Sequence, residues 1–374
     1  MSKTISFNPL TLPTYVMAKP AGSICNLNCS YCYYLEKEKL YQNRKKLEMS
    51  DELLELFTKS YIEAQPVKEV LFTWHGGETL LRDISFYRKA LLYQRKYGRG
   101  RVITNTLQTN GVLLTDEWCR FFKENNFLIG ISIDGPEHCH DAYRKNKGGA
   151  GTFRQVMRGI ELLQKHGVDF NTLSVINDYN VQFPLDVYRF FKEIGSQFMQ
   201  FAPIVERVSD FRPDGLKLLP PEENVEADLA SWTVNPVKFG QFYIEIFDEW
   251  VRNDVGTWYV QLFDSTLANA VGAQPGVCIF AETCGHAAAL EFNGDLYACD
   301  HYVFPEYKLG NIRTQTIFEM MFQERQLQFG ADKRDKLPTQ CRECDVLKFC
   351  HGECPKNRIA TTATGEPGLN YLCQ

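Results

Sequence analysis

The 374-residue sequence has no window of about 18 apolar residues, the length that a membrane-spanning helix requires. Its N-terminus lacks the charged and then apolar pattern of a secretory signal peptide. It also contains no solenoid-type repeat and no low-complexity segment. These absences predict a cytoplasmic protein that does not contact a membrane.

The sequence also lacks an excess of positive charge. It has 41 Lys and Arg against 46 Asp and Glu, and its net charge is -5. Nucleic-acid-binding domains are usually basic, so no nucleic-acid partner is predicted. The hydrophobic content of 44% is ordinary for a globular protein, and the length predicts two or three domains, or one barrel with additions.

Cysteine, by contrast, is abundant, with 13 residues. A disulfide framework is not expected in a cytosolic chain of this size, and clustered cysteines there are typical of metal ligands. Eleven of the thirteen fall in two zones, at 25–32 and at 278–373. Cys119 and Cys139 stand alone, and Cys119 is predicted to be a small buried hydrophobe within a helix.

Strand and helix patterns alternate about six times between residues 14 and 205, which predicts parallel βαβ units that close as a full or partial barrel. A charged segment at 37–46 is expected to be solvated. Strands are expected at 14–19, 70–74, 104–109, 127–133, 169–176 and 198–205, and helices at 51–64, 84–97, 115–125, 153–166 and 183–194.

The alternation of expected strands and helices ends after residue 205. Residues 206–240 are predicted to be a connector, and 242–251 an amphipathic helix. A hairpin is expected at 287–299 with Asn293-Gly294 at its turn, followed by a short helix at 316–323. The expected domains are a barrel at 1–235, a connecting helical segment at 236–277 and a cysteine-rich domain at 278–374.

Cys25, Cys29 and Cys32 form a C-x3-C-x2-C motif. A 4Fe-4S cluster needs four ligands, usually cysteines, so three would leave one iron open, and an open metal position usually indicates chemistry. A zinc knuckle with a fourth ligand from elsewhere is the alternative. The stretch His75-Gly-Gly-Glu78 follows the next expected strand, and both motifs are expected at the strand C-terminal ends, where ligands bind in such folds.

The cysteine trio followed by Gly-Gly-Glu resembles the radical S-adenosylmethionine (SAM) enzymes. The resemblance implies that Glu78 accepts a hydrogen bond from the amino group of SAM, and that Tyr31 lies against its adenine. Capping of a turn is the alternative role for Ser132 and Asp134. The residues expected around the cofactor are Tyr31, Gly76, Gly77, Glu78, Ser132, Asp134, Arg144 and Val205.

The eight C-terminal cysteines resemble the SPASM extension, which implies two auxiliary 4Fe-4S clusters in addition to the first, three in all. Two zinc ribbons are the alternative. The resemblance implies one ligand set of Cys278, Cys284, Cys299 and Cys354, and a second set of Cys341, Cys344, Cys350 and Cys373.

Stretches along the whole chain, among them MAKPAGSICNLNCSYCYY, TLQTNG and ISIDGP, resemble the anaerobic sulfatase-maturating enzymes. Asp300, which follows Cys299, matches the catalytic base of that family. A carboxylate that accepts backbone N–H groups is the alternative, compatible role. His75 and Thr79 stand where relatives carry Gln and Pro, and the end one residue after Cys373 suggests a trimmed C-terminus.

The resemblance implies that a 5′-deoxyadenosyl radical, released from SAM by the reduced cluster, abstracts a Cβ hydrogen from a Cys or Ser of a sulfatase peptide. Asp300 would take the thiol or hydroxyl proton, and a further electron would pass toward an auxiliary cluster to give formylglycine. The implied partners are an unfolded or nascent sulfatase polypeptide and a reductase, flavodoxin or ferredoxin. Tyr34 and Gln108 are candidate substrate contacts.

Two other functions stay open at this point. A SPASM peptide maturase that forms crosslinks would share the cluster motifs, but it often has an additional N-terminal domain, for which the first strand at about residue 14 leaves no room. A zinc-binding scaffold would need neither Gly-Gly-Glu nor Asp300. The choice between Cys-type and Ser-type sulfatases, the electron donor and the oligomeric state are also open.

Overall fold

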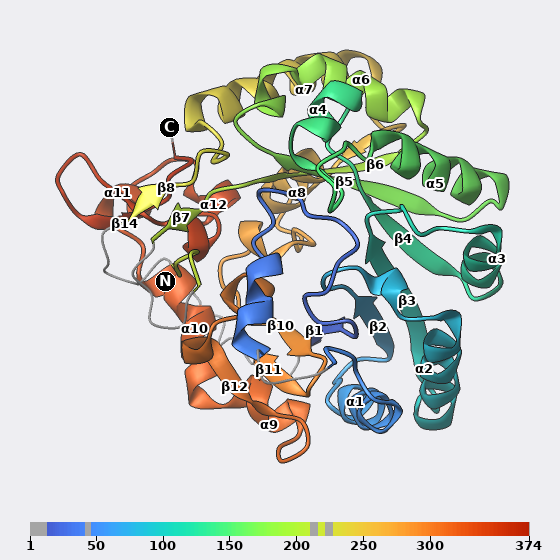
Figure 1. Ribbon diagram of the computed structural model, residues 1–374. Helices are drawn as coiled ribbons and strands as arrows, with labels where there is room; N and C mark the ends of the chain where they lie inside the picture. The colour runs from blue at the N-terminus through green and yellow to red at the C-terminus, as the bar shows by residue number, and fades with distance from the viewer. Residues whose placement is uncertain (1–12, 42–45, 210–215, 221–226, 374) are drawn as a thin grey trace.

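The computed structural model describes residues 13–41, 46–209, 216–220 and 227–373. Its main feature is a curved ten-stranded sheet, in the order β12-β11-β10-β1-β2-β3-β4-β5-β6-β9 (Figure 1). Strands β1 to β6 are neighbours in sequence order and run parallel, which confirms the predicted α/β partial barrel. These six strands are β1 (Tyr15–Lys19), β2 (Glu69–Trp74), β3 (Val102–Thr109), β4 (Phe127–Ser132), β5 (Phe170–Ile176) and β6 (Phe198–Pro203).

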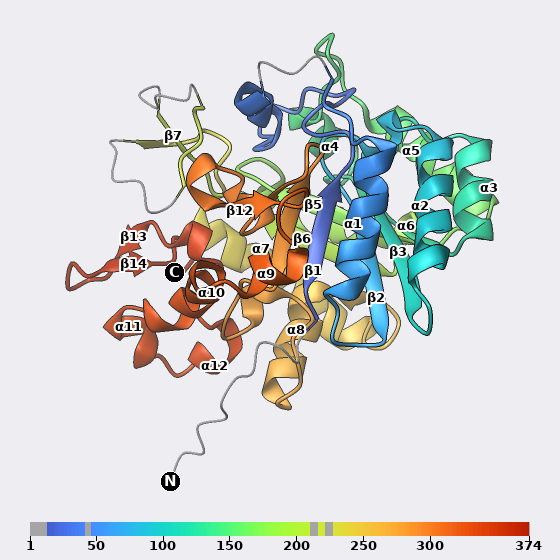
Figure 2. The ribbon, with the colours of Figure 1, turned by 90° about the horizontal axis from the view of Figure 1, so that it is seen from below.

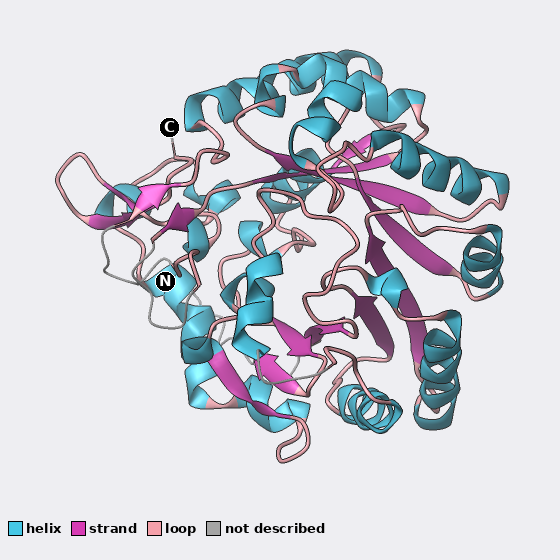
Figure 3. Ribbon diagram, viewed as in Figure 1, coloured by secondary structure: helices cyan, strands magenta, loops and turns pink. Residues whose placement is uncertain are grey.

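Helices that connect these strands form an outer layer around the sheet (Figure 3). Helix α1 illustrates how these helices start and how they pack on the sheet. Ser50 caps its first turn by accepting from the Leu53 N–H at 3.2 Å, and Phe57 packs against Phe72 and Trp74 of β2. The helices are α1 (Asp51–Glu63), α2 (Ile84–Tyr97), α3 (Asp116–Glu124), α4 (Glu137–Tyr143), α5 (Phe153–Lys165) and α6 (Pro184–Glu193).

The expected C-terminal hairpin forms and joins the barrel sheet. Its first strand, β10 (Ala287–Glu291), lies parallel to β1, with Tyr15 opposite Ala287 and Lys19 opposite Glu291. The second, β11 (Asp295–Tyr297), pairs antiparallel with β10 and with β12 (Lys308–Asn311). The chain on either side of residue 278 therefore contributes to one sheet, and the division into domains stays a prediction.

Two local predictions differ from the structure. The charged segment at 37–46 was expected to be solvated, but Lys37 is 2% exposed and lies over the Phe304 ring within a 3-10 helix (Leu35–Tyr41). Residues 42–45 lie outside the described part. The helix expected at 242–251 starts earlier, as α7 (Pro236–Asn253), because Asn235 caps it by accepting from the Lys238 N–H.

The elements that follow α9 (Ile317–Phe322) gather on one side of the molecule (Figure 2), whereas α9 itself contacts α1, where the Ile317 N–H donates to the Ser60 hydroxyl at 3.0 Å. No helix among the described residues is long and apolar enough to cross a membrane. The remaining elements are β7 (Arg207–Val208), β8 (Asp228–Leu229), β9 (Tyr259–Val260), α8 (Gln261–Ala270), α9 (Ile317–Phe322), α10 (Glu324–Asp335), α11 (Thr339–Arg342), α12 (Leu347–Cys350), β13 (Ala360–Thr361) and β14 (Pro367–Leu369).

Candidate active site

The loop after β1 carries Cys25, Cys29 and Cys32. The Leu27 N–H points at the Cys25 sulfur at 3.3 Å, and the loop backbone is held by a bond from the Asn28 N–H to the Lys145 carbonyl at 2.8 Å. Burial raises the pKa of Cys25 to about 12 and that of Cys29 to about 11. Because only thiolates bind metal, these cysteines need a nearby cation to ionise at neutral pH, and a site for iron fits that requirement.

The Gly-Gly-Glu turn after β2 packs directly against the start of this loop. The Gly77 N–H donates to the Gly22 carbonyl and the Glu78 N–H to the Ile24 carbonyl, each at 2.8 Å. A Cβ atom on Gly77 would lie 2.0 Å from the Ile24 carbonyl oxygen, so only glycine fits there. In this structure the close approach is to the cysteine loop, and contact of Gly76 and Gly77 with a ligand stays a prediction.

Glu78 is 1% exposed, and protein groups occupy most of its carboxylate. Oε1 accepts from the Leu80 N–H at 2.9 Å and from the Thr109 hydroxyl at 2.7 Å, whereas Oε2 accepts from the Asn110 N–H at 2.9 Å. Burial raises the pKa of Glu78, and these hydrogen bonds oppose the rise. Oε2 has room for one further donor, so the site fits the expected ammonium group.

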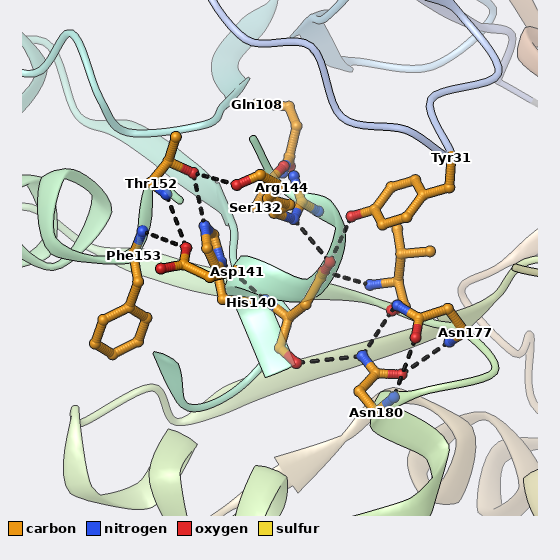
Figure 4. A network of polar contacts seen from close by, with 12 residues as sticks. Tyr31, Gln108, Ser132, His140, Asp141, Arg144, Thr152, Phe153, Asn177 and Asn180 are labelled. Atoms are coloured by element: carbon orange, nitrogen blue, oxygen red, sulfur yellow. Dashed lines mark hydrogen bonds and ion pairs between the residues drawn. The ribbon is translucent and has the colours of Figure 1, made fainter. Parts of the chain in front are cut away.

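Two of the predicted cofactor contacts, Asp134 and Arg144, form a buried network with Tyr31 (Figure 4). The Tyr31 hydroxyl donates to Asp134 Oδ2 at 2.5 Å, and Arg144 Nε lies 2.9 Å from the same oxygen. Asp134 Oδ1 accepts from the Val175 N–H at 3.0 Å, and Gln108 donates its amide to the Ser132 hydroxyl at 2.8 Å. The structure brings these residues together, but their role as cofactor contacts stays a prediction.

Asp300 follows β11 and lies beside the C-terminal end of β1. Its Oδ1 forms an ion pair with Lys19, and its Oδ2 accepts from the Tyr33 hydroxyl. The Asp300 side chain is 14% exposed. Burial alone would raise its pKa, but the positive charge of Lys19, aided by His75 and His301, holds that pKa below its usual range. Asp300 is therefore an ionised carboxylate at neutral pH.

The two groups that hold Asp300, Lys19 and Tyr33, were not predicted from the sequence. Lys19 is the last residue of β1. A polar residue at the end of an apolar strand indicates a candidate site residue, because site residues collect at the C-terminal ends of strands. Tyr33 directly follows Cys32 and offered no such signal. His75 was noted only as a departure from relatives, and burial lowers its pKa to about 4, so it is neutral at pH 7.

Two other predicted contacts lie in protein surroundings. Tyr34 is buried beside the hairpin, and its hydroxyl donates to the carboxylate of Glu291. Val205 is buried just after β6, where its carbonyl accepts from Lys356 Nζ at 2.5 Å. Contact of Tyr34 with the substrate and of Val205 with the cofactor stays a prediction.

The eight C-terminal cysteines are expected from the sequence to form two groups of ligands, and this division stays a prediction. Burial, and then repulsion from Cys278 and Cys354, raises the pKa of Cys299. Burial, and then repulsion from two other thiols of its group, raises the pKa of Cys373. One group contains Cys278, Cys284, Cys299 and Cys354, and the other contains Cys341, Cys344, Cys350 and Cys373.

A cavity of about 340 Å³ lies where the second group converges, and all four of its cysteines line it together with apolar side chains such as Phe239 and Leu262. In the described part of the chain, no three His, Cys, Asp or Glu side chains are placed to hold a single metal ion. The four ligands of a 4Fe-4S cluster do not meet at a single metal position, because each thiolate binds a different iron. The cavity therefore fits a multinuclear group.

Comparison with known proteins agrees with this arrangement. Residues 20–191 match the family model of the Radical SAM superfamily, and residues 278–345 match that of SPASM, an iron-sulfur cluster-binding domain. The first range holds the cysteine trio and the Gly-Gly-Glu turn, and the second holds Asp300 and five of the eight C-terminal cysteines.

Similarity to curated and solved relatives extends over the whole chain. A serine-type anaerobic sulfatase-maturating enzyme of Bacteroides thetaiotaomicron is 59% identical over 372 residues, covering 100% of this chain and 90% of the relative. A cysteine-type enzyme of Clostridium perfringens is 31% identical, covering 97% and 94%. A solved structure, native anSMEcpe with bound AdoMet and Cp18Cys peptide, is 30% identical with a TM-score of 0.82, covering 96% and 93%. The chain therefore belongs to the radical SAM enzymes with a SPASM domain, in the family of anaerobic sulfatase-maturating enzymes.

Proposed function

We propose that this enzyme oxidises a side chain of an unfolded or nascent sulfatase polypeptide to Cα-formylglycine, and that serine is its preferred target. The preference for serine is supported by the 59% identity to a relative named serine-type, against 31% to one named cysteine-type. The observation that carries the reaction is the ionised Asp300 carboxylate, held between Lys19 and Tyr33 directly after Cys299.

Three 4Fe-4S clusters and SAM are the proposed cofactors. Cys25, Cys29 and Cys32 would hold the first cluster, and the two C-terminal groups of four cysteines would hold the others. When bound, the first cluster and SAM supply a 5′-deoxyadenosyl radical that takes a hydrogen atom from the substrate Cβ. Glu78 would bind the amino group of SAM through Oε2, and the network of Tyr31, Asp134 and Arg144 would border the nucleoside.

Oxidation of serine to the aldehyde removes one hydrogen atom from Cβ, one proton from the hydroxyl and one electron. Asp300 would accept the proton, which requires it to lie within hydrogen-bond reach of the substrate hydroxyl. The electron needs an acceptor, and the C-terminal cysteine groups would hold clusters suited to that role. A cysteine substrate would give a thioaldehyde, which water then converts to the same aldehyde.

The proposal also includes a cellular location, an electron donor and two substrate contacts. The enzyme would work in the cytoplasm and receive its reducing electron from a flavodoxin, a ferredoxin or another reductase. Gln108 and Tyr34 are proposed as substrate contacts, and Gln108 has the more suitable position because its amide already reaches the Ser132 hydroxyl at the end of β4.

Activity on short peptides tests this proposal. Anaerobically reconstituted protein is incubated with dithionite, SAM and a peptide containing Ser-x-Pro-x-Arg, Cys-x-Pro-x-Arg or, as the control, Ala-x-Pro-x-Arg. Peptide mass and 5′-deoxyadenosine are measured together. We expect the aldehyde mass from the serine peptide at a higher rate than from the cysteine peptide.

The alternative outcomes are distinct. A faster reaction with the cysteine peptide would overturn the serine preference alone. Deoxyadenosine with every peptide unchanged would overturn the sulfatase assignment and favour a radical enzyme that crosslinks a ribosomal peptide. An iron-replete sample that forms no deoxyadenosine would contradict the proposed mechanism altogether.

A further inference from the structure

We propose that Lys19 is a positioning residue, which holds the Asp300 carboxylate in the orientation that meets the substrate. The inference rests on the proposed function of Asp300 as the base. It adds a second residue, contributed by the first strand of the barrel, to a catalytic group contributed by the C-terminal extension.

Lys19 is placed for this task by the sheet itself. It is the last residue of β1, it is 0% exposed, and its Nζ forms the ion pair with Asp300 Oδ1. The same Nζ lies 3.5 Å from the centre of the Tyr34 ring, over its face. Burial of an ammonium is unfavourable unless charges and rings compensate it, and here Asp300 and the Tyr34 ring do so.

Asp300 is held at both oxygens. Lys19 forms an ion pair with Oδ1 and Tyr33 donates to Oδ2, so each carboxylate oxygen faces one group. These two groups lie on opposite sides of the cysteine loop in the sequence. Without Lys19, the Tyr33 hydroxyl would remain as a hydrogen-bond donor to the carboxylate. A base that is misplaced by about 1 Å can lose on the order of 10²-fold in rate.

A second carboxylate beside Lys19 offers a competing explanation. Glu291 lies opposite Lys19 in the parallel register of β1 and β10 and is 0% exposed. Its Oε1 accepts from Tyr34, whereas its Oε2 has no hydrogen-bond partner in the described part of the chain. Lys19 could therefore serve merely to balance the charge of Glu291. The two roles predict different behaviour of a double variant.

The test compares K19Q, K19R and K19Q/E291Q with wild type. Lys192→Gln is the matched control, because this lysine also pairs with two carboxylates, Glu249 and Asp254, but on the outer helices. The measured quantities are deoxyadenosine, formylglycine per deoxyadenosine, the KM for the serine peptide, iron per chain and the midpoint of thermal unfolding.

For K19Q we expect deoxyadenosine, iron content and peptide KM to stay close to wild type. Formylglycine per deoxyadenosine should fall by about 10²-fold, because the base is no longer oriented. K19R should recover most of the loss, since it restores a cation at the same place. K19Q/E291Q should remain as defective as K19Q, and K192Q should behave as wild type.

Three results would overturn the inference. The first is a K19Q enzyme with the wild-type product ratio. The second is recovery of that ratio in K19Q/E291Q, which would show that Lys19 only balances Glu291. The third is equal loss of iron and thermal stability in K19Q and K19R, which would show a role in folding. If wild type itself forms deoxyadenosine but no formylglycine, it is the proposed function that fails, and the inference falls with it.

Discussion

At the scale of single residues, the site depends on the groups that contact the Asp300 carboxylate. Asp300 has one contact from Lys19 and one from Tyr33, and the positive charge nearby holds its pKa below the usual range. Such a carboxylate is already ionised at neutral pH. It can therefore take a proton without first losing one of its own.

Asp300→Asn removes that ability and keeps nearly the same shape. We expect formylglycine formation to fall by about 10²- to 10⁴-fold, the usual contribution of a general base, while SAM cleavage to deoxyadenosine continues. Parallel mass spectrometry of peptide and nucleoside measures both. Asp248→Asn, at an exposed site on α7, is the control and should change neither quantity. Unimpaired formylglycine formation by D300N would show that Asp300 is not the base.

Gly77→Ala tests the contact between the Gly-Gly-Glu turn and the cysteine loop. The new Cβ would meet the Ile24 carbonyl at 2.0 Å, and a backbone atom moves less easily than a side chain, so we expect a loss of about 1–3 kcal/mol in the free energy of unfolding. Iron per chain should fall by up to one cluster. Urea denaturation and iron analysis measure these changes.

Gly148→Ala is the matched control, because its Cβ would meet only the side chain of Asn146, at 3.3 Å. It should change the free energy of unfolding by no more than about 0.5 kcal/mol. Equal behaviour of G77A and G148A would contradict the structural role of Gly77.

At the scale of elements, helix α10 organises the first C-terminal cysteine group. Lys333, which is fully buried on α10, donates from its Nζ to the carbonyls of Cys278, Ile279 and Ala281. Burial lowers the pKa of Lys333, and the neighbouring thiols oppose that effect. One side chain therefore shapes the turn that presents Cys278.

Lys333→Met should open this turn. Each hydrogen bond to a charged group contributes about 1.5–3 kcal/mol, and the three are not additive, so we expect a loss of about 3 kcal/mol in stability. Iron per chain should also drop while the N-terminal cluster site stays intact. Lys336→Met, at a 62% exposed side chain that pairs with Asp332, should cost no more than about 1 kcal/mol. A fully loaded, stable K333M enzyme would show that the turn forms without Lys333.

At the scale of the whole molecule, the barrel and the C-terminal extension share one sheet. Strand β10 pairs with β1 along five residues, from Tyr15 opposite Ala287 to Lys19 opposite Glu291. The extension therefore covers an edge of the barrel and also brings Asp300 to it. A chain without the extension would expose both the edge of β1 and the core behind it.

Truncation after residue 277 tests this dependence and the predicted domain boundary together. We expect the fragment to aggregate or to unfold without a cooperative transition, because it loses the β1 partner. Size-exclusion chromatography and thermal unfolding measure this, with the full chain as reference. A monomeric fragment with a sharp transition would show instead that residues 1–277 fold on their own.

Much of this protein could be predicted from the sequence because the information is local. Five of the predicted helices and six strands of the barrel appear within a few residues of their expected bounds. The cap at Ser50, the turn at Asn293-Gly294 and the spacing of Cys25, Cys29 and Cys32 each depend on residues near one another in the chain. The burial of Lys37 was predicted wrongly, because its partner ring, Phe304, lies far along the sequence.

The sequence by itself determined the alternation of strands and helices and the cysteine-rich motifs, and its resemblance to a known family pointed to Asp300. Only the tertiary structure decided that β10 lies beside β1, so that Lys19 faces both Asp300 and Glu291. The physical reason is that register between strands separated by more than two hundred residues is set by the packing of the whole sheet. No local pattern encodes it, and the charges of the site are paired only once that sheet has formed.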